Sequence, residues 1–442
     1  MQSASNGWNF NLNNGNTNNN NKNNSNYALP CAECTERFDR YFVAERECFM
    51  NKKSKWAAYK SHYNLSKMWE LIEELESGDY SPKRSLCFIV SYPTYREIFA
   101  SEYLGRVVHH LVAPYIIRIS EQVHMANGDV THGNRRGHSA LTAAMQIQSR
   151  MRQCADGVVF KYDISGFFMS ISRKLAYEVF CRYERMYRPS DIPENERLLL
   201  MRHIEKIVFN DPTKDCIRRC DISEWENIPS NKTLFKKDGK GLPIGNYPSQ
   251  LLAVLLLAIL DEQLHISHFV DDFCGIVKTS ADAHRILNEA KRILENIELR
   301  MHPTKIYIQP VHHGVKFCGY VIYPDRIYIS NRTRSAAIQT IDHWLSKSVC
   351  VENAEHIAQS FNSYTGIMSH ARSYNIQCDL MNRILQSEFA KFLVFQSKTN
   401  HISCRIRQKY TYKSTYHNDI QYINSKQYGS NSSRKTRRLS SR

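Results

Sequence analysis

The chain has 442 residues, with 59 Lys and Arg against 43 Asp and Glu, which gives a formal net charge of +16. This length allows two or three structural units, and an apolar content of 42% excludes a chain that is disordered throughout. The positive charge favours a polyanionic partner such as nucleic acid. The longest wholly apolar run, 251–260, is too short to span a bilayer, so we expect no membrane partner.

The cysteines indicate a reducing compartment. There are 13 of them, and the polar N-terminus lacks the basic and then apolar segments of an export signal. We therefore expect free thiols and a cytoplasmic protein. Two close pairs, Cys31 with Cys34 and Cys216 with Cys220, could together supply four zinc ligands. Because the pairs lie far apart and lack a neighbouring His pattern, four unrelated thiols are the preferred interpretation.

The N-terminal part divides into a polar segment and a helical one. Residues 1–27 are of low complexity, with 13 Asn among the 21 residues from 6 to 26, and lack the apolar residues of a core, which predicts disorder. Residues 28–80 are expected to form a helical extension, because Trp69, Leu71, Ile72 and Leu75 recur at helical spacing.

The next elements alternate between strands and helices. Residues 86–99 predict a strand, a turn with proline and a second strand. Residues 106–120 predict a buried helix that is interrupted near Pro114. A loop rich in Gly, Asn and Arg follows at 127–140, and a helix is expected from Leu141.

The middle of the chain carries the clearest strand patterns. GVVFKYDI, residues 157–164, predicts a buried strand, whereas the polar residues 182–240 are expected to form an irregular insertion with several short helical stretches. The Gly- and Pro-containing loop 241–250 opens an apolar helix at 249–264. HFVDDFCGIV, residues 268–277, predicts a hairpin with two aspartates at its turn.

The C-terminal part predicts a helical unit and a basic tail. A helix is expected at 281–299, strands at 305–311 and 315–323, and mainly helices at 335–396. From Lys398 onward there are 11 Lys and Arg and a single acid, Asp419. Tyrosines alternate with these basic residues, a pattern that suits nucleic-acid binding and equally suits a disordered tail without selectivity.

Three aspartates form the strongest candidate site. In FVDDF, Asp271 and Asp272 lie between two apolar segments, where adjacent like charges repel unless a cation relieves them. Mg²⁺ prefers such oxygen ligands, although a solvated Asp-Asp turn explains the motif alone about as well. Asp163 ends the strand 157–164. A strand that presents one Asp beside a hairpin that presents two is the pattern of a two-metal phosphoryl-transfer site.

These motifs, in this order, resemble the reverse transcriptase family over about residues 80–375. The resemblance assigns Asp163, Asp271 and Asp272 as catalytic residues and ligands of two Mg²⁺ ions, with Mn²⁺ as an alternative. It implies an α+β right-hand polymerase with fingers, a ferredoxin-like palm and a helical thumb. The expected divisions are fingers and palm at 81–330, a thumb at 331–397 and a basic tail at 398–442.

Further residues receive roles by the same resemblance. Phe168 corresponds to the aromatic residue under the incoming sugar, and Lys305 and Arg96 to basic residues near the triphosphate. KFCGY, which contains Phe317 and Gly319, resembles the hairpin that grips the primer. From the residues alone, Phe168 could be an ordinary core residue, Lys305 a solvated one, and Arg96 the partner of Glu97 in a surface ion pair.

The loop before the long apolar helix indicates which group of reverse transcriptases the chain resembles. It has the sequence IGNYPSQ, with Ile244, Gly245 and Gln250, and resembles the dNTP-binding loop of reverse transcriptases from diversity-generating retroelements. REIFASEYLGRVVHH at 96–110 and SYTGIMSHARSY at 363–374 resemble the same group. The group's fidelity is low at template adenines. An aliphatic side chain at 244 cannot hydrogen-bond near the templating base, although such a residue is more commonly just packed.

The resemblance also implies partners. They are a structured template RNA, a DNA or RNA primer, dNTPs and a small basic accessory protein, in a bacterial or phage-encoded system that diversifies a target gene. Arg135 and Arg136, in the loop 127–140, are candidate contacts to template phosphates, although a solvated loop explains them equally well. The alternatives are a retron-like or phage-defence reverse transcriptase and, in a different class, a non-catalytic RNA-binding scaffold.

The Asn-rich segment has a second interpretation at the level of RNA. Template repeats of these retroelements are dense in AAY codons, which translate as Asn, so residues 1–27 could be a translated template repeat. We then expect a chain that lacks residues 1–27 to retain full primer-extension activity. Loss of activity on this deletion, measured at equal concentrations of folded protein, would make the segment a working part of the enzyme.

Overall fold

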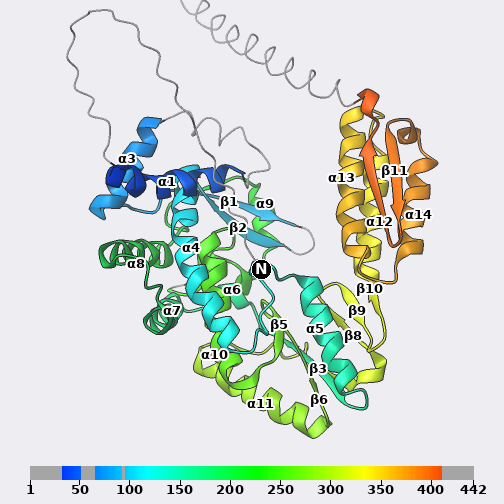
Figure 1. The fold of residues 1–442 in the computed structure, drawn as a ribbon, viewed down its shortest axis with the longest axis horizontal. Helices are drawn as coiled ribbons and strands as arrows, with labels where there is room; N and C mark the ends of the chain where they lie inside the picture. The colour runs from blue at the N-terminus through cyan, green and yellow to red at the C-terminus, as the bar shows by residue number, and fades with distance from the viewer. Residues whose placement is uncertain (1–31, 51–64, 92–94, 238, 411–442) are drawn as a thin grey trace, which may run out of the picture.

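The computed structural model describes residues 32–50, 65–91, 95–237 and 239–410. Within these ranges the chain forms an α+β fold whose strands pair mostly antiparallel. Figure 1 shows a large body of helices and strands and, beside it, a separate group of C-terminal helices with a hairpin. This is the right-hand polymerase architecture of fingers, palm and thumb that the sequence predicts.

The palm is built on a four-stranded antiparallel sheet in the order β5-β6-β3-β7. Its strands are β3 (Val158–Asp163), β5 (Ser267–Phe269), β6 (Asp272–Val277) and β7 (Tyr307–Pro310). Helices separate β3 from β5 and β6 from β7, so the chain order is strand, helix, two strands, helix, strand. The sheet order and this connectivity are those of a ferredoxin-like fold, which confirms the prediction for the palm.

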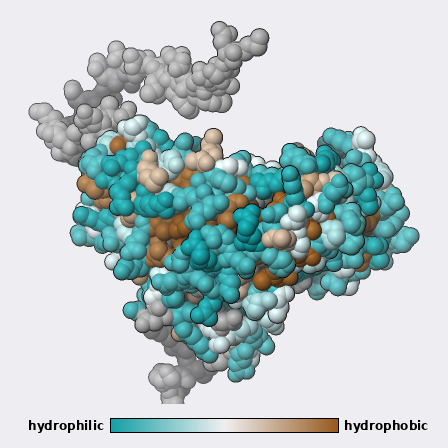
Figure 2. All heavy atoms as spheres, turned by 90° about the horizontal axis from the view of Figure 1, so that it is seen from below, coloured by the Kyte–Doolittle hydropathy of each residue, from teal (hydrophilic) through white to brown (hydrophobic). Residues whose placement is uncertain are grey.

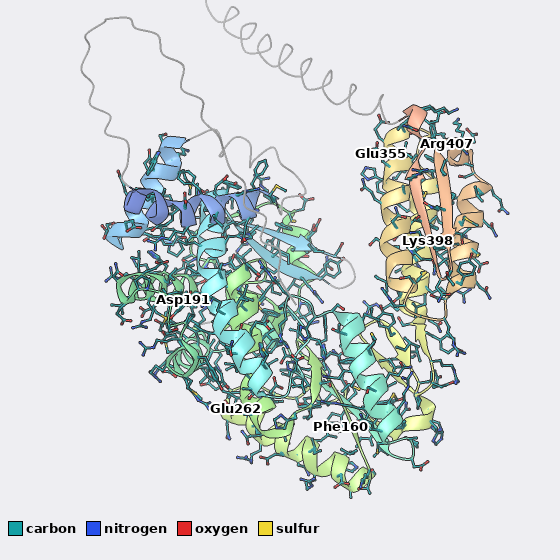
Figure 3. The ribbon with its side chains drawn as sticks, viewed as in Figure 1. Phe160, Asp191, Glu262, Glu355, Lys398 and Arg407 are labelled. Carbon is teal, nitrogen blue, oxygen red and sulfur yellow. The ribbon has the colours of Figure 1, made fainter. Side chains whose placement is uncertain are left out.

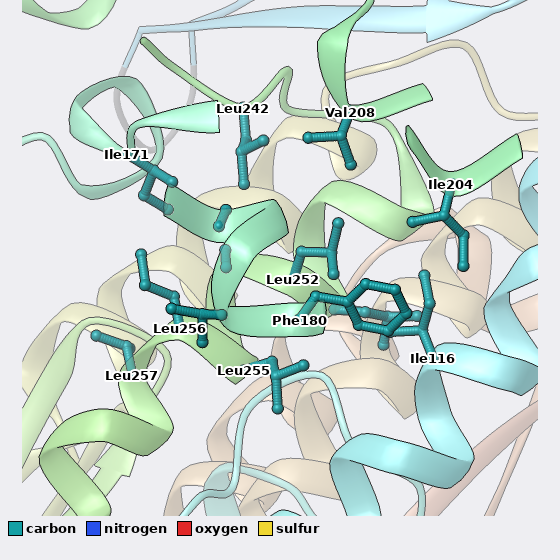
Figure 4. Packing of buried hydrophobic residues seen from close by; sticks show 14 of the residues in the cluster. Ile116, Ile171, Phe180, Ile204, Val208, Leu242, Leu252, Leu255, Leu256 and Leu257 are labelled. Carbon is teal, nitrogen blue, oxygen red and sulfur yellow. The ribbon is translucent and has the colours of Figure 1, made fainter. Parts of the chain in front are cut away.

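Five helices enclose the palm core. They are α4 (Tyr103–Ala126), α7 (Arg173–Tyr187), α8 (Glu194–Phe209), α10 (Tyr247–Leu264) and α11 (Ser280–Asn296). Helix α10 is apolar on all sides and is buried along most of its length, as expected of a central helix. Figure 4 shows Leu252 and Leu255 of α10 among Ile116, Phe180 and Ile204, which come from three surrounding helices.

Helix α4 differs from the prediction at its proline. Pro114 lies inside the helix, which continues to Ala126 without the predicted interruption. A proline removes one hydrogen bond of the helix and is unfavourable by about 3 kcal/mol. Val112, Ala113, Tyr115 and Ile116 around it are buried, and this burial offsets the lost bond.

The fingers contain a second sheet, in the order β2-β1-β4. The predicted strand pair is confirmed as β1 (Ser85–Val90) and β2 (Arg96–Ser101). The third strand, β4 (Cys216–Arg218), pairs parallel to β1 and comes from the predicted insertion 182–240. That segment also supplies α8 and the short helix α9 (Ile222–Glu226), which agrees with the helical stretches predicted there. Because β4 pairs with β1, the segment completes the fingers sheet and is not a separate insertion.

The N-terminal helices pack onto the same body. Helix α1 (Ala32–Met50) and α3 (Leu65–Ser77) bury Tyr41, Leu71 and Leu75 in the main core. The described part of the predicted extension 28–80 is therefore helical before Tyr80. The Asn-rich segment 1–27 lies outside the described residues, as do 411–442 of the tail.

A third sheet connects the palm to the thumb. It has the order β10-β9-β8 and contains β8 (Val315–Phe317), β9 (Tyr320–Ile322) and β10 (Ile327–Ile329). The predicted strand 315–323 is thus a hairpin whose two turn residues, Cys318 and Gly319, both have positive φ. Two residues with positive φ are the signature of a type I′ hairpin turn. Helix α5 (Ala140–Gln153) shares a core with this sheet.

The thumb extends beyond its predicted end. Its helices are α12 (Asn331–Leu345), α13 (Val351–Met368) and α14 (Tyr374–Leu385), and its hairpin is β11 (Leu393–Lys398) with β12 (His401–Ile406). Figure 3 shows Lys398 and Arg407 in the hairpin region beside α13, which carries Glu355. The Asn362 side-chain amide of α13 donates a hydrogen bond to the Cys404 carbonyl and accepts one from the Cys404 N–H. Residues 398–406 are therefore part of the thumb, and the predicted start of the tail at 398 was wrong.

The surface is mostly hydrophilic. Figure 2 shows hydrophilic residues over most of one face, with hydrophobic residues gathered along its middle. Among the described residues no helix is both long enough and apolar enough to cross a membrane.

Substitutions at two glycines would test the close contact between the fingers sheet and the loop before α10. Gly245 has a φ of +114°, and a Cβ there would lie 2.5 Å from the Phe99 carbonyl oxygen of β2, whereas Gly239 has a φ of +63° and open space. We expect Gly239→Ala to destabilise by about 1 kcal/mol and Gly245→Ala by roughly 3 kcal/mol, because only the second adds a backbone clash. Urea unfolding measures both variants. Equal losses would contradict the close contact.

Candidate active site

A tight turn between β5 and β6 presents two of the three aspartates. We call Phe269–Asp272 the Asp turn; Phe269 pairs with Asp272, which leaves Val270 and Asp271 as its tip. Val270 has a φ of +58°. A positive φ is a genuine outlier for a β-branched residue and is unfavourable by about 1–3 kcal/mol. The protein therefore holds Val270 in a strained conformation immediately before Asp271.

The third aspartate ends the neighbouring strand. Asp163 is the last residue of β3 and pairs directly with Asp272 of β6. The backbone N–H of Ile164 donates to the Asp271 carbonyl at 3.3 Å, which fixes the turn against the end of β3. The predicted grouping of the three aspartates is thus present, at the ends of two paired strands.

The proximity of these carboxyl groups changes their acidity. Burial, with the Asp163 charge as the next cause, raises the pKa of Asp271 to about 6. Burial also raises the pKa of Asp272, although the Lys161 ammonium acts in the opposite direction. Burial is thus the main cause of both shifts, and at Asp271 the neighbouring Asp163 charge adds to it.

Two lysines provide part of the neutralisation. Lys161 Nζ lies 2.8 Å from Asp272 Oδ1, and Lys305 Nζ lies 2.5 Å from Asp163 Oδ2. Lys305 is about half exposed and lies beside the carboxylates, which is compatible with its predicted place near a triphosphate. Sequence reasoning missed Lys161. Its signal was available, because a residue two positions before Asp163 in a strand lies on the same face.

The predicted primer-grip hairpin lies next to the aspartates. Lys161 Nζ donates to the Lys316 carbonyl at 3.3 Å and lies 5.5 Å from the centre of the Phe317 ring. Phe317 is buried, and Gly319, with a φ of +85°, forms the turn. One ammonium group therefore connects β3, Asp272 and this hairpin.

The loop before α10 connects the fingers to the helix after β3. The Leu242 N–H donates to the Phe168 carbonyl at 2.8 Å, and the Phe99 N–H donates to the Ile244 carbonyl at 2.7 Å. Phe168 is half-buried in the short helix α6 (Phe167–Ser170). The Ile244 side chain packs against a small core cluster that includes Phe99 and Leu234, so packing explains at least part of its apolar character.

The remaining residues predicted to bind the dNTP near this loop are exposed or half-buried. Gly245 is exposed, and Gln250 is half-buried in the first turn of α10. Arg96 is exposed at the start of β2 and has no ion pair among the described residues. The alternative pairing of Arg96 with Glu97 is excluded, because Glu97 is buried and accepts hydrogen bonds from Thr233 Oγ1 and the Leu234 N–H.

Arg135 and Arg136 have different environments. The Arg135 side chain is only 4% exposed and forms ion pairs with Glu121 at 2.8 Å and Asp129 at 2.7 Å. Arg135 is therefore an internal structural residue, and its prediction as a template contact was wrong. The residue type alone could not reveal the two acidic partners. Arg136 is exposed and stays a candidate phosphate contact.

The donor set at the Asp turn suits Mg²⁺. Its three carboxylates provide hard oxygen ligands, and Mg²⁺ typically takes one or two carboxylates together with substrate phosphates and water. Accordingly the site needs no complete protein cage, and the described residues form no group of three or more His, Cys, Asp and Glu poised around one ion. For the zinc alternative, Cys31 lies outside the described residues, and Cys220 Sγ accepts a hydrogen bond from the Ile89 N–H at 3.2 Å.

Comparison with known proteins finds distant similarities to two solved telomerase structures. No protein-family model matches the chain, and no curated protein matches it in sequence. Among solved structures, telomerase of Candida albicans, in complex with a fragment of telomeric RNA, is similar with a TM-score of 0.39 and 10% identity, over 70% of this chain and 56% of that one. Apo telomerase of Candida tropicalis gives a TM-score of 0.42 and 9% identity, over 68% of this chain and 60% of that one. This chain thus spans less than two thirds of either telomerase.

The raised pKa of Asp271 predicts a gain in stability when its charge is removed. An Asp whose pKa is about 6 in the folded protein and near 4 in the unfolded chain destabilises the fold when ionised. We expect Asp271→Asn, without metal, to raise the free energy of unfolding by roughly 1–3 kcal/mol above pH 6. The gain should shrink as the pH falls from 6 and vanish below pH 4, where Asp271 is protonated in both states. Denaturant titrations in EDTA at several pH values measure this, and a gain independent of pH would contradict the assignment.

Proposed function

We propose that this protein is an RNA-directed DNA polymerase. The observation that supports the proposal best is the set of Asp163, Asp271 and Asp272 at the ends of two paired strands in a ferredoxin-like palm. The fold places fingers before this palm and a thumb after it. A non-catalytic scaffold would have no reason to retain three repelling carboxylates beside a strained turn.

In this proposal the three aspartates hold two Mg²⁺ ions, with Mn²⁺ as a possible substitute. When bound, the ions would activate the primer 3′-hydroxyl and stabilise the leaving pyrophosphate. Lys305 and Lys161 form ion pairs with Asp163 and Asp272, and in this proposal their ammonium groups would bind substrate phosphate beside the metal. Arg96 presents an exposed guanidinium from the fingers, a group that binds two phosphate oxygens at once.

The remaining residues orient the substrates. Phe168 offers an aromatic face for the sugar, and Gly245 and Gln250 shape the loop at the incoming nucleotide. Phe317 and Gly319 form the hairpin for the primer end. The exposed Arg136 is a candidate contact to the template.

We further propose the specialised role that the sequence resemblance implies. The enzyme would copy a template-repeat RNA into cDNA with low fidelity at adenines and so diversify a target gene, together with a small basic accessory protein. Ile244 supports this role, because an aliphatic side chain in the loop before α10 offers no hydrogen bond to a base.

Primer extension on an RNA template tests the polymerase proposal directly. With Mg²⁺, dNTPs, template RNA and the accessory protein, we expect the intact chain to extend the primer. Asp271→Ala should lower the rate at least 1,000-fold, about 4 kcal/mol in the barrier, while the protein stays folded. The matched control is Asp191→Ala, which removes an exposed aspartate paired with Arg118 and should leave the rate unchanged.

Two outcomes would contradict the proposal. One is a complete absence of incorporation by the intact complex, and the other is an unchanged rate in Asp271→Ala. Sequencing of the cDNA separates the general function from the specialised one. Errors concentrated opposite template adenines support diversification, whereas uniform high fidelity would restrict the proposal to an ordinary reverse transcriptase.

A further inference from the structure

A buried polar network lies directly behind the Asp turn. It consists of Thr131, Asp261 of α10 and His268 of β5, whose residues are all at most 1% exposed. His268 Nε2 lies 3.1 Å from Asp261 Oδ2, and Thr131 Oγ1 donates to the same oxygen at 2.9 Å. Buried ionisable groups of this kind are unfavourable unless they are paired. Their presence in the core therefore calls for a function.

The network ends on the strained residue. His268 Nδ1 lies 2.9 Å from the carbonyl oxygen of Val270. Because a carbonyl only accepts, the proton of this bond belongs to Nδ1. The bond holds the peptide between Val270, with its positive φ, and Asp271. The His268 ring also stacks on Phe273 at 4.6 Å, which fixes its plane.

The loop 129–135 packs closely against the Asp turn. The backbones of Thr131 and His268 form a bridge, and a Cβ on Gly133 would lie 2.7 Å from the backbone nitrogen of Val270. Arg135 donates to the Thr131 carbonyl at 2.7 Å and anchors the loop to Glu121 of α4. The internal role of Arg135 is thus to hold the loop that carries Thr131.

The charge state of the network agrees with this geometry. Burial alone would lower the pKa of His268, but the Asp261 carboxylate and its hydrogen bond raise it above the usual value. The pair resembles in kind the carboxylate–histidine pairs that orient ligands in metal sites, whose loss typically lowers metal affinity or activity by about 10–100-fold.

We propose that Asp261 and His268 are positioning residues that hold Val270 in its left-handed conformation and thereby direct Asp271 into the metal site. The inference rests on the proposed polymerase function only for its kinetic consequence. Asp261 fixes the imidazole, the imidazole fixes the Val270 carbonyl, and this peptide sets the direction of the Asp271 side chain. Neither residue touches the substrate.

The test compares His268→Gln with a matched buried histidine. His203 of α8 is 1% exposed in the same core and serves as the control in His203→Gln. In the intact complex we expect His268→Gln to raise the Mg²⁺ concentration for half-maximal primer extension about 10-fold and to lower kcat by about 10–100-fold. The dissociation constant of the primer–template duplex should stay within about 2-fold, and His203→Gln should change stability only.

Rescue by glycine separates positioning from simple stabilisation. Glycine adopts a positive φ without strain, so adding Val270→Gly to His268→Gln should restore much of the lost rate and metal affinity. A merely structural role would make the two changes add. Unchanged metal dependence in His268→Gln, or no recovery in the double variant, would overturn the proposal.

A second readout is independent of polymerase activity. Binding of Mn²⁺ to the full chain, followed by electron paramagnetic resonance, should weaken about 10-fold in His268→Gln and recover with Val270→Gly. If the wild type binds Mn²⁺ but extends no primer, the proposed function fails while this comparison still decides the positioning role. Equal Mn²⁺ binding by wild type and His268→Gln would overturn the inference.

Discussion

The repulsion among three carboxylates is the constraint on which the rest of the palm depends. Asp163 and Asp272 are paired residues on adjacent strands, and Asp271 follows a backbone conformation that valine disfavours. No local preference of the chain would produce this arrangement. It persists because β3 and β6 are central strands of the sheet and because Lys161 and Lys305 partly offset the charge. The palm thus holds an energetically unfavourable conformation and unfavourable charge contacts at the Asp turn.

The elements with strong hydrophobic periodicity could be predicted from the sequence, and so could the three aspartates. Strand β3, the β5–β6 hairpin and helix α10 matched their predictions, because a continuous run of mostly apolar residues marks each of them in the sequence. The strand β4 could not be predicted in the same way. Its three residues are mostly exposed, and only pairing with β1, about 130 positions earlier in the chain, makes them a strand.

The site residues show the same limit. The sequence identifies Arg135 as basic and therefore as a candidate phosphate contact, but its side chain is buried, and its acidic partners come from α4 and from its own loop. Lys161 was hidden within an apolar strand pattern, and Asp261 within a long apolar helix. A polar residue inside such a pattern is a signal of a buried network, yet its partners are fixed only by the tertiary fold.

Helix α10 explains how these separate features act together. Its N-terminal end follows the loop with Ile244 and Gly245, and the Ile244 carbonyl accepts a hydrogen bond from Phe99 of the fingers strand β2. Its last turns carry Asp261, which lies behind the Asp turn. Most residues of this 18-residue helix are buried in the core. One helix thus links the loop that contacts the fingers strand β2 to the residues behind Asp271. A displacement of the fingers that moved this helix would reach the aspartates through Asp261, His268 and Val270, so the polar network makes the geometry of the carboxylates depend on the packing of the whole palm.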